Sequence, residues 1–119
     1  MTVTDHSDSR LAPVERGNAH YSIGTELYSP RLTVVRATGD LDLRARTDLA
    51  QALDAALRGE TVVLLDLSAV TFMYSGSACA ILDAASRCAG RLEVFAPTRP
   101  ARVVLDALGV AVGADPRAA

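Results

Sequence analysis

One stretch of the sequence decides the fold: TVVLLDL, residues Thr61–Leu67. Its apolar residues are consecutive and do not alternate with polar ones. A strand with one face in water alternates, whereas a parallel strand covered on both faces does not. The stretch therefore predicts an interior parallel strand, with four residues nearly all buried: Val62, Val63, Leu64 and Leu65.

Patterns on both sides of this strand predict helices and further strands. Two apolar stripes have helical spacing; they consist of Leu49, Ala52, Leu53, Ala56 and Leu57, and of Ala78, Ile81, Leu82, Ala85 and Ala89. The β-rich runs 20–28 and 32–37 predict an antiparallel hairpin, 92–96 a last strand, and 100–109 a short helix. The predicted order is β-β-α-β-α-β-α, an α/β fold in which helices pack on a mixed sheet. We expect one domain over 19–112, with a flexible N-terminal tail (1–18) and a C-terminal tail (113–119).

Composition excludes several functional classes. The chain has 119 residues and a formal charge of −2, and half of its residues are apolar. All 12 basic residues are arginines and no block of like charge stands out, so we expect neither nucleic acid nor a membrane surface as partner. No apolar run reaches the roughly 20 residues that span a bilayer, and no secretory signal is visible. We therefore expect a cytoplasmic protein.

Residues for catalysis or metal binding are scarce. The two histidines, His6 and His20, are not placed to activate a serine, so an enzyme is not expected. Histidines and cysteines show no ligand spacing, and we expect no metal and no cofactor. Cys79 and Cys88 lie nine residues apart on one predicted helix, on opposite faces, so they should be free thiols and buried.

Two segments follow predicted strands, where α/β proteins place their sites. The first is GDLDL, Gly39–Leu43, whose aspartates are read as turn and cap residues. The second is FMYSGSA, Phe72–Ala78, just before a predicted helix. The backbone N–H groups there could hold an anion. An N-cap at Ser75 or Ser77 is the favoured interpretation, because serine caps are common.

These segments together resemble the STAS domain family of sulfate transporters and anti-sigma factor antagonists. Gly39–Leu43 is similar to the family's GELD segment, and Asp66–Met73, DLSAVTFM, to its DLSxVxFMDSSG block. Val103–Gly109 resembles the closing helix. The resemblance covers about residues 20–110 in the expected order and spacing. It implies the same α/β fold and a regulatory protein that binds a serine-kinase-type anti-sigma factor.

The family's phosphorylation motif is degenerate in this chain. An ungapped alignment places Tyr74 on the family aspartate, Ser75 on its first serine and Gly76 on the phospho-acceptor. Glycine has no hydroxyl, so residue 76 accepts no phosphate. Shifting the alignment by one residue would make Ser75 the acceptor, at the cost of an insertion in the helix; Ser77 is the other candidate.

The resemblance implies a non-enzymatic protein-interaction domain. Its expected partner-binding residues are Asp42, Tyr74, Ser75, Gly76 and Ser77. Two alternatives stay open: a ligand-sensing or scaffold STAS module that holds a small anion or nucleotide at the Tyr74–Ser77 helix start, and a protein that acts only through self-association.

Overall fold

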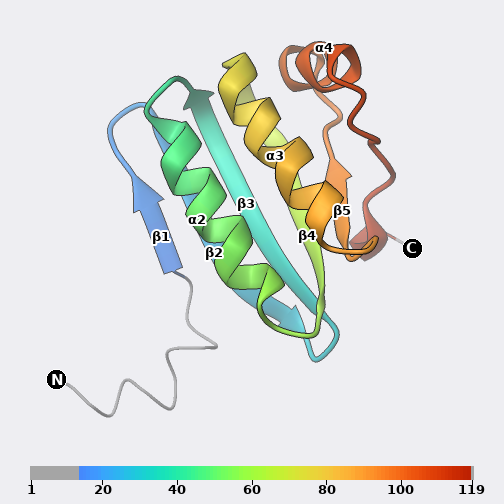
Figure 1. The fold of residues 1–119 in the computed structure, drawn as a ribbon. Coiled ribbons are helices and arrows are strands. Elements are labelled where there is room, and N and C mark those ends of the chain that lie inside the picture. The colour runs from blue at the N-terminus through green and yellow to red at the C-terminus, as the bar shows by residue number, and fades with distance from the viewer. Residues whose placement is uncertain (1–13, 119) are drawn as a thin grey trace, which may run out of the picture.

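The computed structural model describes residues 14–118 (Figure 1). It contains five strands and three α-helices. In chain order these are β1 (Val14–Gly17), β2 (Tyr21–Ser29), β3 (Leu32–Leu41), α2 (Ala45–Leu57), β4 (Val62–Met73), α3 (Ser75–Arg87), β5 (Leu92–Phe95) and α4 (Arg99–Ala107), followed by a 3-10 turn (Pro116–Ala118).

The strands form one mixed sheet in the order β1-β2-β3-β4-β5. The pairs β1/β2 and β2/β3 are antiparallel, and β3/β4 and β4/β5 are parallel. This confirms the predicted α/β class and adds one strand at the start of the predicted order. Residues 14–17 pair with β2 and are therefore part of the sheet instead of the predicted tail, while residues 1–13 of that tail, with His6, lie outside the described residues.

Strand β4 is the interior strand that the TVVLLDL stretch predicts. Val63, Leu64 and Leu65 have no exposed surface, but Val62 is 36% exposed. The prediction is wrong for Val62 because β5 begins to pair with β4 only at Val63, which leaves the first residue of β4 without a neighbour on that side.

Strand β4 is also longer than the predicted strand Thr61–Leu67 and continues through Met73. Its register against β3 shifts between Arg36 and Thr38 and again between Gly39 and Asp40. Each shift inserts one residue into β4, so the side chains of Leu67, Val70 and Met73 point inward at intervals of three. The pairs Ser68–Ala69 and Thr71–Phe72 stay exposed.

Helices α2 and α3 lie side by side on one face of the sheet (Figure 1). The predicted α2 stripe is confirmed at Leu49, Ala52 and Leu53, which are buried. The buried face of α3 instead contains Ser77, Ala78, Ile81 and Ala84.

The α3 stripe is thus rotated from the predicted one, and the expected burial of Cys79 is wrong. Leu82 is 38% exposed, Cys79 is exposed, and only Cys88 is buried; both thiols are free. Several faces of a helix rich in alanine and serine are equally small and apolar, so the sequence pattern does not single out the one that packs.

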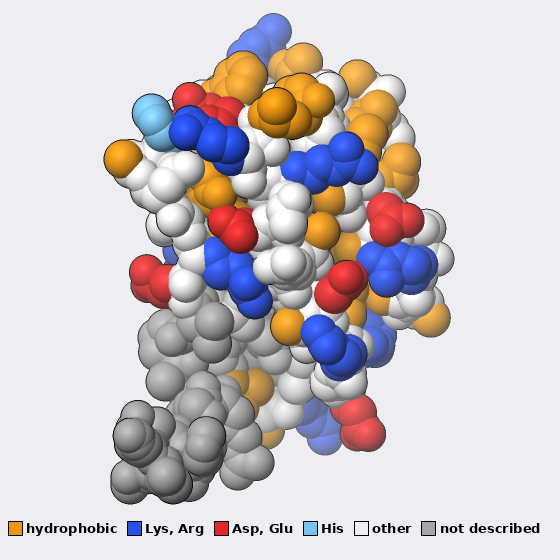
Figure 2. Space-filling view, turned by 60° about the vertical axis from the view of Figure 1, so that its left-hand side comes forward, with side chains coloured by type: hydrophobic (Ala, Val, Ile, Leu, Met, Phe, Trp, Pro, Cys, Tyr) orange, Lys and Arg blue, Asp and Glu red, His pale blue; other side chains and the backbone are white. Residues whose placement is uncertain are grey.

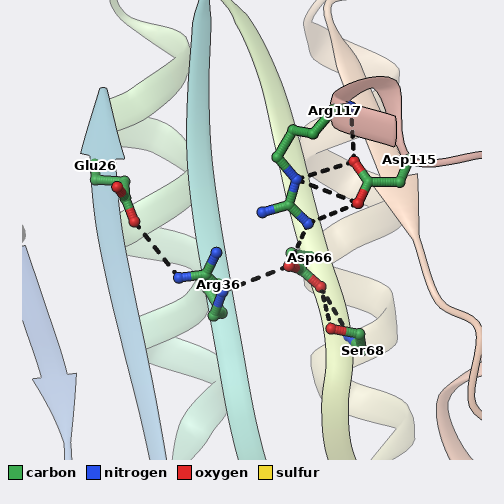
Figure 3. Close-up of polar contacts among 6 residues, drawn as sticks. All are labelled: Glu26, Arg36, Asp66, Ser68, Asp115 and Arg117. Carbon is green, nitrogen blue, oxygen red and sulfur yellow. Dashed lines mark hydrogen bonds and ion pairs between the residues drawn. The ribbon is translucent and has the colours of Figure 1, made fainter. Parts of the chain in front are cut away.

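The end of the chain returns to the sheet instead of forming the predicted tail. The Gly113 amide donates to the Val94 carbonyl at 2.9 Å, and Arg117 Nη2 donates to Asp66 Oδ2 at 2.6 Å. Asp66 also contacts Arg36 on β3, on the sheet face turned away from α2 and α3 (Figure 3). Residues 113–118 therefore fold with the domain.

Candidate functional site

The two segments singled out in the sequence meet at one end of the sheet. Leu41 and Met73, the last residues of β3 and β4, pair with each other. The Tyr74 amide then donates to the Leu41 carbonyl at 2.8 Å. This hydrogen bond brings the loop containing Asp42 beside the start of α3. We call this end, formed by residues 40–46 and 72–77, the carboxyl edge.

Gly39 allows the chain to enter this edge. Its φ of +85° is a conformation that L residues rarely adopt, and a Cβ there would collide with the His20 carbonyl oxygen and lie 3.2 Å from Tyr21 Cα. The close approach of β2 therefore requires glycine at residue 39.

Asp42 is committed to its own loop. Its carboxylate accepts hydrogen bonds from the Arg44 amide at 3.0 Å and from Arg44 Nη2 at 2.8 Å. The hydrogen bond from the Arg44 side chain lowers the pKa of Asp42 below its ordinary value. Asp42 is therefore charged at neutral pH and partly neutralised by Arg44.

The Tyr21 side chain, on β2, holds the start of α2 through its hydroxyl group. Its hydroxyl donates to Asp48 Oδ2 at 2.7 Å and lies 3.2 Å from the Arg44 carbonyl oxygen. Burial and the neighbouring Asp48 carboxylate raise the pKa of Tyr21 to about 12. This anchor is not predictable from the sequence, because a tyrosine in a β-rich run does not indicate its partner on a helix.

Tyr74 and Gly76 form a matched pair at the start of α3. Tyr74 is the N-cap residue in an extended conformation, with φ −71° and ψ 140°. A Cβ on Gly76 would collide with Tyr74 Cε2 and lie 2.9 Å from Tyr74 Cδ2. The tyrosine ring thus occupies the space that a side chain at residue 76 would need.

The two serines of this segment have opposite environments. Ser75 is exposed, whereas Ser77 has no exposed surface and its Oγ has no hydrogen-bond partner among residues 14–118. Neither serine caps α3: the N-cap is Tyr74, with no capping side chain in the described part of the chain. The predicted serine cap is wrong because the helix begins at Ser75 itself, one residue after the extended Tyr74.

The start of α3 offers few free backbone donors. The amides of Ser77 and Ala78 both donate to the Tyr74 carbonyl, at 2.9 and 3.3 Å. The Tyr74 amide is used by β3. An anion at this helix start would therefore be left with the amides of Ser75 and Gly76.

Two exposed apolar side chains at the carboxyl edge were missed in the sequence. Leu43 is 65% exposed and Phe72 is 51% exposed. Figure 2 shows hydrophobic side chains gathered over this upper end of the molecule, next to arginines. The exposure of Leu43 could have been inferred from its position between charged residues in a loop. The exposure of Phe72 could not, because it results from the bulge in β4.

Other site types find no support in residues 14–118. No group of three or more metal-ligating side chains occurs in this range. None of the described helices is both long and apolar enough to cross a bilayer.

Comparison with known proteins identifies the class of the fold. The sequence model of the family described as "Mlab, STAS domain" matches residues 29–112. The chain therefore belongs to the STAS domain family, and the resemblance inferred from its motifs is confirmed. A search of curated proteins finds no significant match.

Solved structures of anti-sigma factor antagonists share the fold. One from Mycobacterium paratuberculosis is 21% identical with a TM-score of 0.69, over 79% of this chain and 82% of that chain. Phosphorylated SpoIIAA, a Bacillus cell fate determinant, is 20% identical with a TM-score of 0.63, over 81% and 95%. A Rhodobacter sphaeroides STAS domain, an antisigma-factor antagonist, is 24% identical with a TM-score of 0.53, over 67% and 88%.

Proposed function

We propose that this domain is a non-enzymatic regulator that binds a serine-kinase-type anti-sigma factor through its carboxyl edge. The partner would contact Asp42, Tyr74 and Ser75, whereas Gly76 is buried and would shape this surface through its contact with the Tyr74 ring. The proposal takes its partner from the solved anti-sigma factor antagonists that share the fold. Ser77 has no exposed surface, so no direct contact with the partner is proposed for it.

The main support for this proposal is the packing of the Tyr74 ring on Gly76. Phosphate would bring about −1.5 to −2 charges to the helix start. Residue 76 has no hydroxyl, and the Tyr74 ring fills the space beside it. The edge would thus bind its partner without a phosphate switch at residue 76.

Of the two serines, Ser75 is the better alternative acceptor. Its side chain is exposed at the first residue of α3, whereas a kinase would reach Ser77 only after local unfolding. A small anion or nucleotide at this helix start, the second candidate function, would have the unpartnered Ser77 hydroxyl as its supporting observation.

The test is a pull-down of purified anti-sigma kinases by this protein, followed by incubation with ATP and intact-mass measurement. We expect a complex that persists with ATP and no phosphate on residue 76. Stoichiometric phosphate on Ser75, mapped by peptide analysis, would mean that the switch has moved to that residue. Absence of any complex, together with thermal stabilisation by a nucleotide, would support the ligand-sensing function instead.

A matched variant pair sharpens the experiment. Tyr74→Asp with Gly76→Ser rebuilds a family-like acceptor loop, and we expect it to take up phosphate when the kinase binds. Gly76→Ser alone keeps the tyrosine ring over the new side chain and should be phosphorylated far less. Equal phosphorylation of both variants would contradict a blocking role for Tyr74.

A further inference from the structure

We infer that the carboxyl edge, together with helix α4, which packs against β4, recognises an acidic amphipathic segment of a partner protein, one that carries carboxylates beside an apolar face. The inference rests on the proposed function in taking this edge as the docking surface, and it adds the chemistry of the partner. Its evidence is a set of exposed apolar residues and a set of arginines at the same end of the molecule.

The apolar part of the surface comes from different elements. Leu43 lies just before α2, Phe72 near the end of β4, and Val103 on α4; their exposed fractions are 65%, 51% and 51%. Figure 1 shows the starts of α2 and α3 and the whole of α4 at the same end of the molecule. Exposed apolar side chains gathered in one region, with a polar rim, are typical of protein-interaction sites.

Three arginines belong to the elements at this end: Arg46 to α2, and Arg99 and Arg102 to α4. All three are exposed, and none makes an ion pair with any residue from 14 to 118. We call them the arginine rim. The nearby carboxylate of Asp42 is already held by Arg44. The rim therefore presents positive charge that an acidic partner would compensate.

The position of the rim within its helices supports a binding role. Arg46 lies in the first turn of α2, and Arg99 and Arg102 lie at the start of α4. A helix N-terminus carries partial positive charge and favours acidic side chains, so arginine there is unfavourable for the isolated fold. The first turns of α3 and α4 contain no acidic residue, whereas that of α2 contains Asp48, whose carboxylate accepts a hydrogen bond from Tyr21. Carboxylates supplied by a partner would form ion pairs with the arginines and interact favourably with the positive ends of the α3 and α4 dipoles.

The same arrangement predicts a salt-dependent encounter. Charge complementarity across an interface mainly raises the association rate, and salt screens it within about 8–10 Å. The apolar residues Leu43 and Phe72 would then supply the contact area that excludes water. An acidic segment without an apolar face should therefore bind weakly.

The test uses a fluorescent synthetic helix with leucines on one face and glutamates on the other. We expect this peptide to bind, its lysine counterpart to fail, and salt to weaken the complex. Arg46→Gln with Arg102→Gln should weaken binding about tenfold. The charge-matched control is Arg31→Gln with Arg58→Gln, two exposed arginines in the β2–β3 turn and at the C-terminus of α2. That turn and that helix end lie opposite the helix starts (Figure 1), so the control should change binding less than about twofold.

Three outcomes would overturn the inference. The lysine peptide could bind as well as the glutamate peptide, or both arginine double variants could weaken binding equally. Alternatively, anionic phosphatidylglycerol vesicles could capture the protein through the arginine rim while the glutamate peptide does not, which would assign the rim to a lipid surface.

Failure of the proposed function is recognised separately. An anti-sigma kinase that binds wild-type protein and the Arg46→Gln, Arg102→Gln variant equally well would leave the proposed function standing and overturn the inference. The reverse result, binding of the glutamate peptide without any kinase complex, would overturn the proposed function alone.

Discussion

The carboxyl edge and the ion-pair network on the opposite sheet face treat polar groups in contrasting ways. In the network, buried Asp66 accepts hydrogen bonds from Ser68 and Arg117 and contacts Arg36 (Figure 3). At the edge, the buried Ser77 hydroxyl has no partner among residues 14–118, and Leu43 and Phe72 face solvent. The network thus pairs its buried carboxylate, whereas the edge leaves a buried hydroxyl unpaired among the described residues and two large apolar side chains exposed.

This contrast indicates that the Asp66 network contributes more to the stability of the fold than the carboxyl edge does. Burial alone would raise the pKa of Asp66, but hydrogen bonds from Ser68 and Arg117 lower it below the ordinary value. A lowered pKa means that the folded state favours the charged carboxylate, so the network stabilises the fold at neutral pH. The edge has unsatisfied and exposed groups that add little to folding. Mutations in the two regions should therefore have different consequences.

The largest effect is expected in the interior strand beneath both regions. Leu65→Ala should lower the free energy of unfolding by about 2–5 kcal/mol, because Leu65 has no exposed surface. Leu43→Ala at the edge, where the side chain is 65% exposed, should change it by less than about 0.5 kcal/mol. Urea unfolding of both variants measures the difference. Equal losses would show that the edge is part of the stabilising core.

Arg117→Ala should be the most damaging change in the network. It leaves the Asp66 carboxylate, 3% exposed, without its closest cation, and we expect a loss of about 1–3 kcal/mol in urea unfolding. Arg102→Ala removes an exposed rim arginine and serves as the control, with little change expected. A loss no larger for Arg117→Ala than for Arg102→Ala would contradict the structural role of the network.

The pH dependence of Arg117→Ala follows from the lowered pKa of Asp66 and the lowered pKa of Asp115, since both carboxylates accept hydrogen bonds from Arg117. The network's contribution is present above the ordinary aspartate pKa of about 3.9 and disappears as pH falls through the lower folded value. The stability gap between wild type and Arg117→Ala should therefore be constant near neutral pH and shrink below about pH 4. Thermal unfolding of both proteins between neutral and acidic pH tests this prediction. A stability difference that grows on acidification would contradict it.

Gly76→Ser tests the packing at the edge. The new side chain must displace the Tyr74 ring, so we expect a cost of about 1–2 kcal/mol. In a Tyr74→Ala background the same substitution should cost clearly less, because the ring is gone. A double-mutant cycle measures this coupling. Additive effects would show that the ring moves aside freely.

The smallest effects compare one serine from each region. Ser68→Ala removes a hydroxyl that donates to Asp66 Oδ1 at 2.7 Å and should destabilise by about 1 kcal/mol. Ser77→Ala removes a buried hydroxyl with no partner among the described residues, and should be neutral or stabilising. Chemical denaturation of the two variants decides between them. Destabilisation by Ser77→Ala would show that its hydroxyl finds a partner in solution.

The sequence by itself determined the class of fold and the two segments that end neighbouring strands. Consecutive apolar residues in Thr61–Leu67 need cover on both faces, which only an interior strand provides. The GDLDL and FMYSGSA segments end neighbouring parallel strands, so their meeting at one edge also followed from the sequence. These features depend on local chemistry and on strand direction, both of which are readable along the chain.

Tertiary structure alone decided which side chains face outward and which are joined. Bulges in β4 exposed Phe72, and the packing of α3 buried Ser77 while exposing Cys79. The bond between Arg117 and Asp66 joins residues 51 positions apart. The physical reason is that strand register and helix rotation minimise the energy of the whole core, and a one-residue change in either reverses a side chain's exposure with little trace in the local sequence.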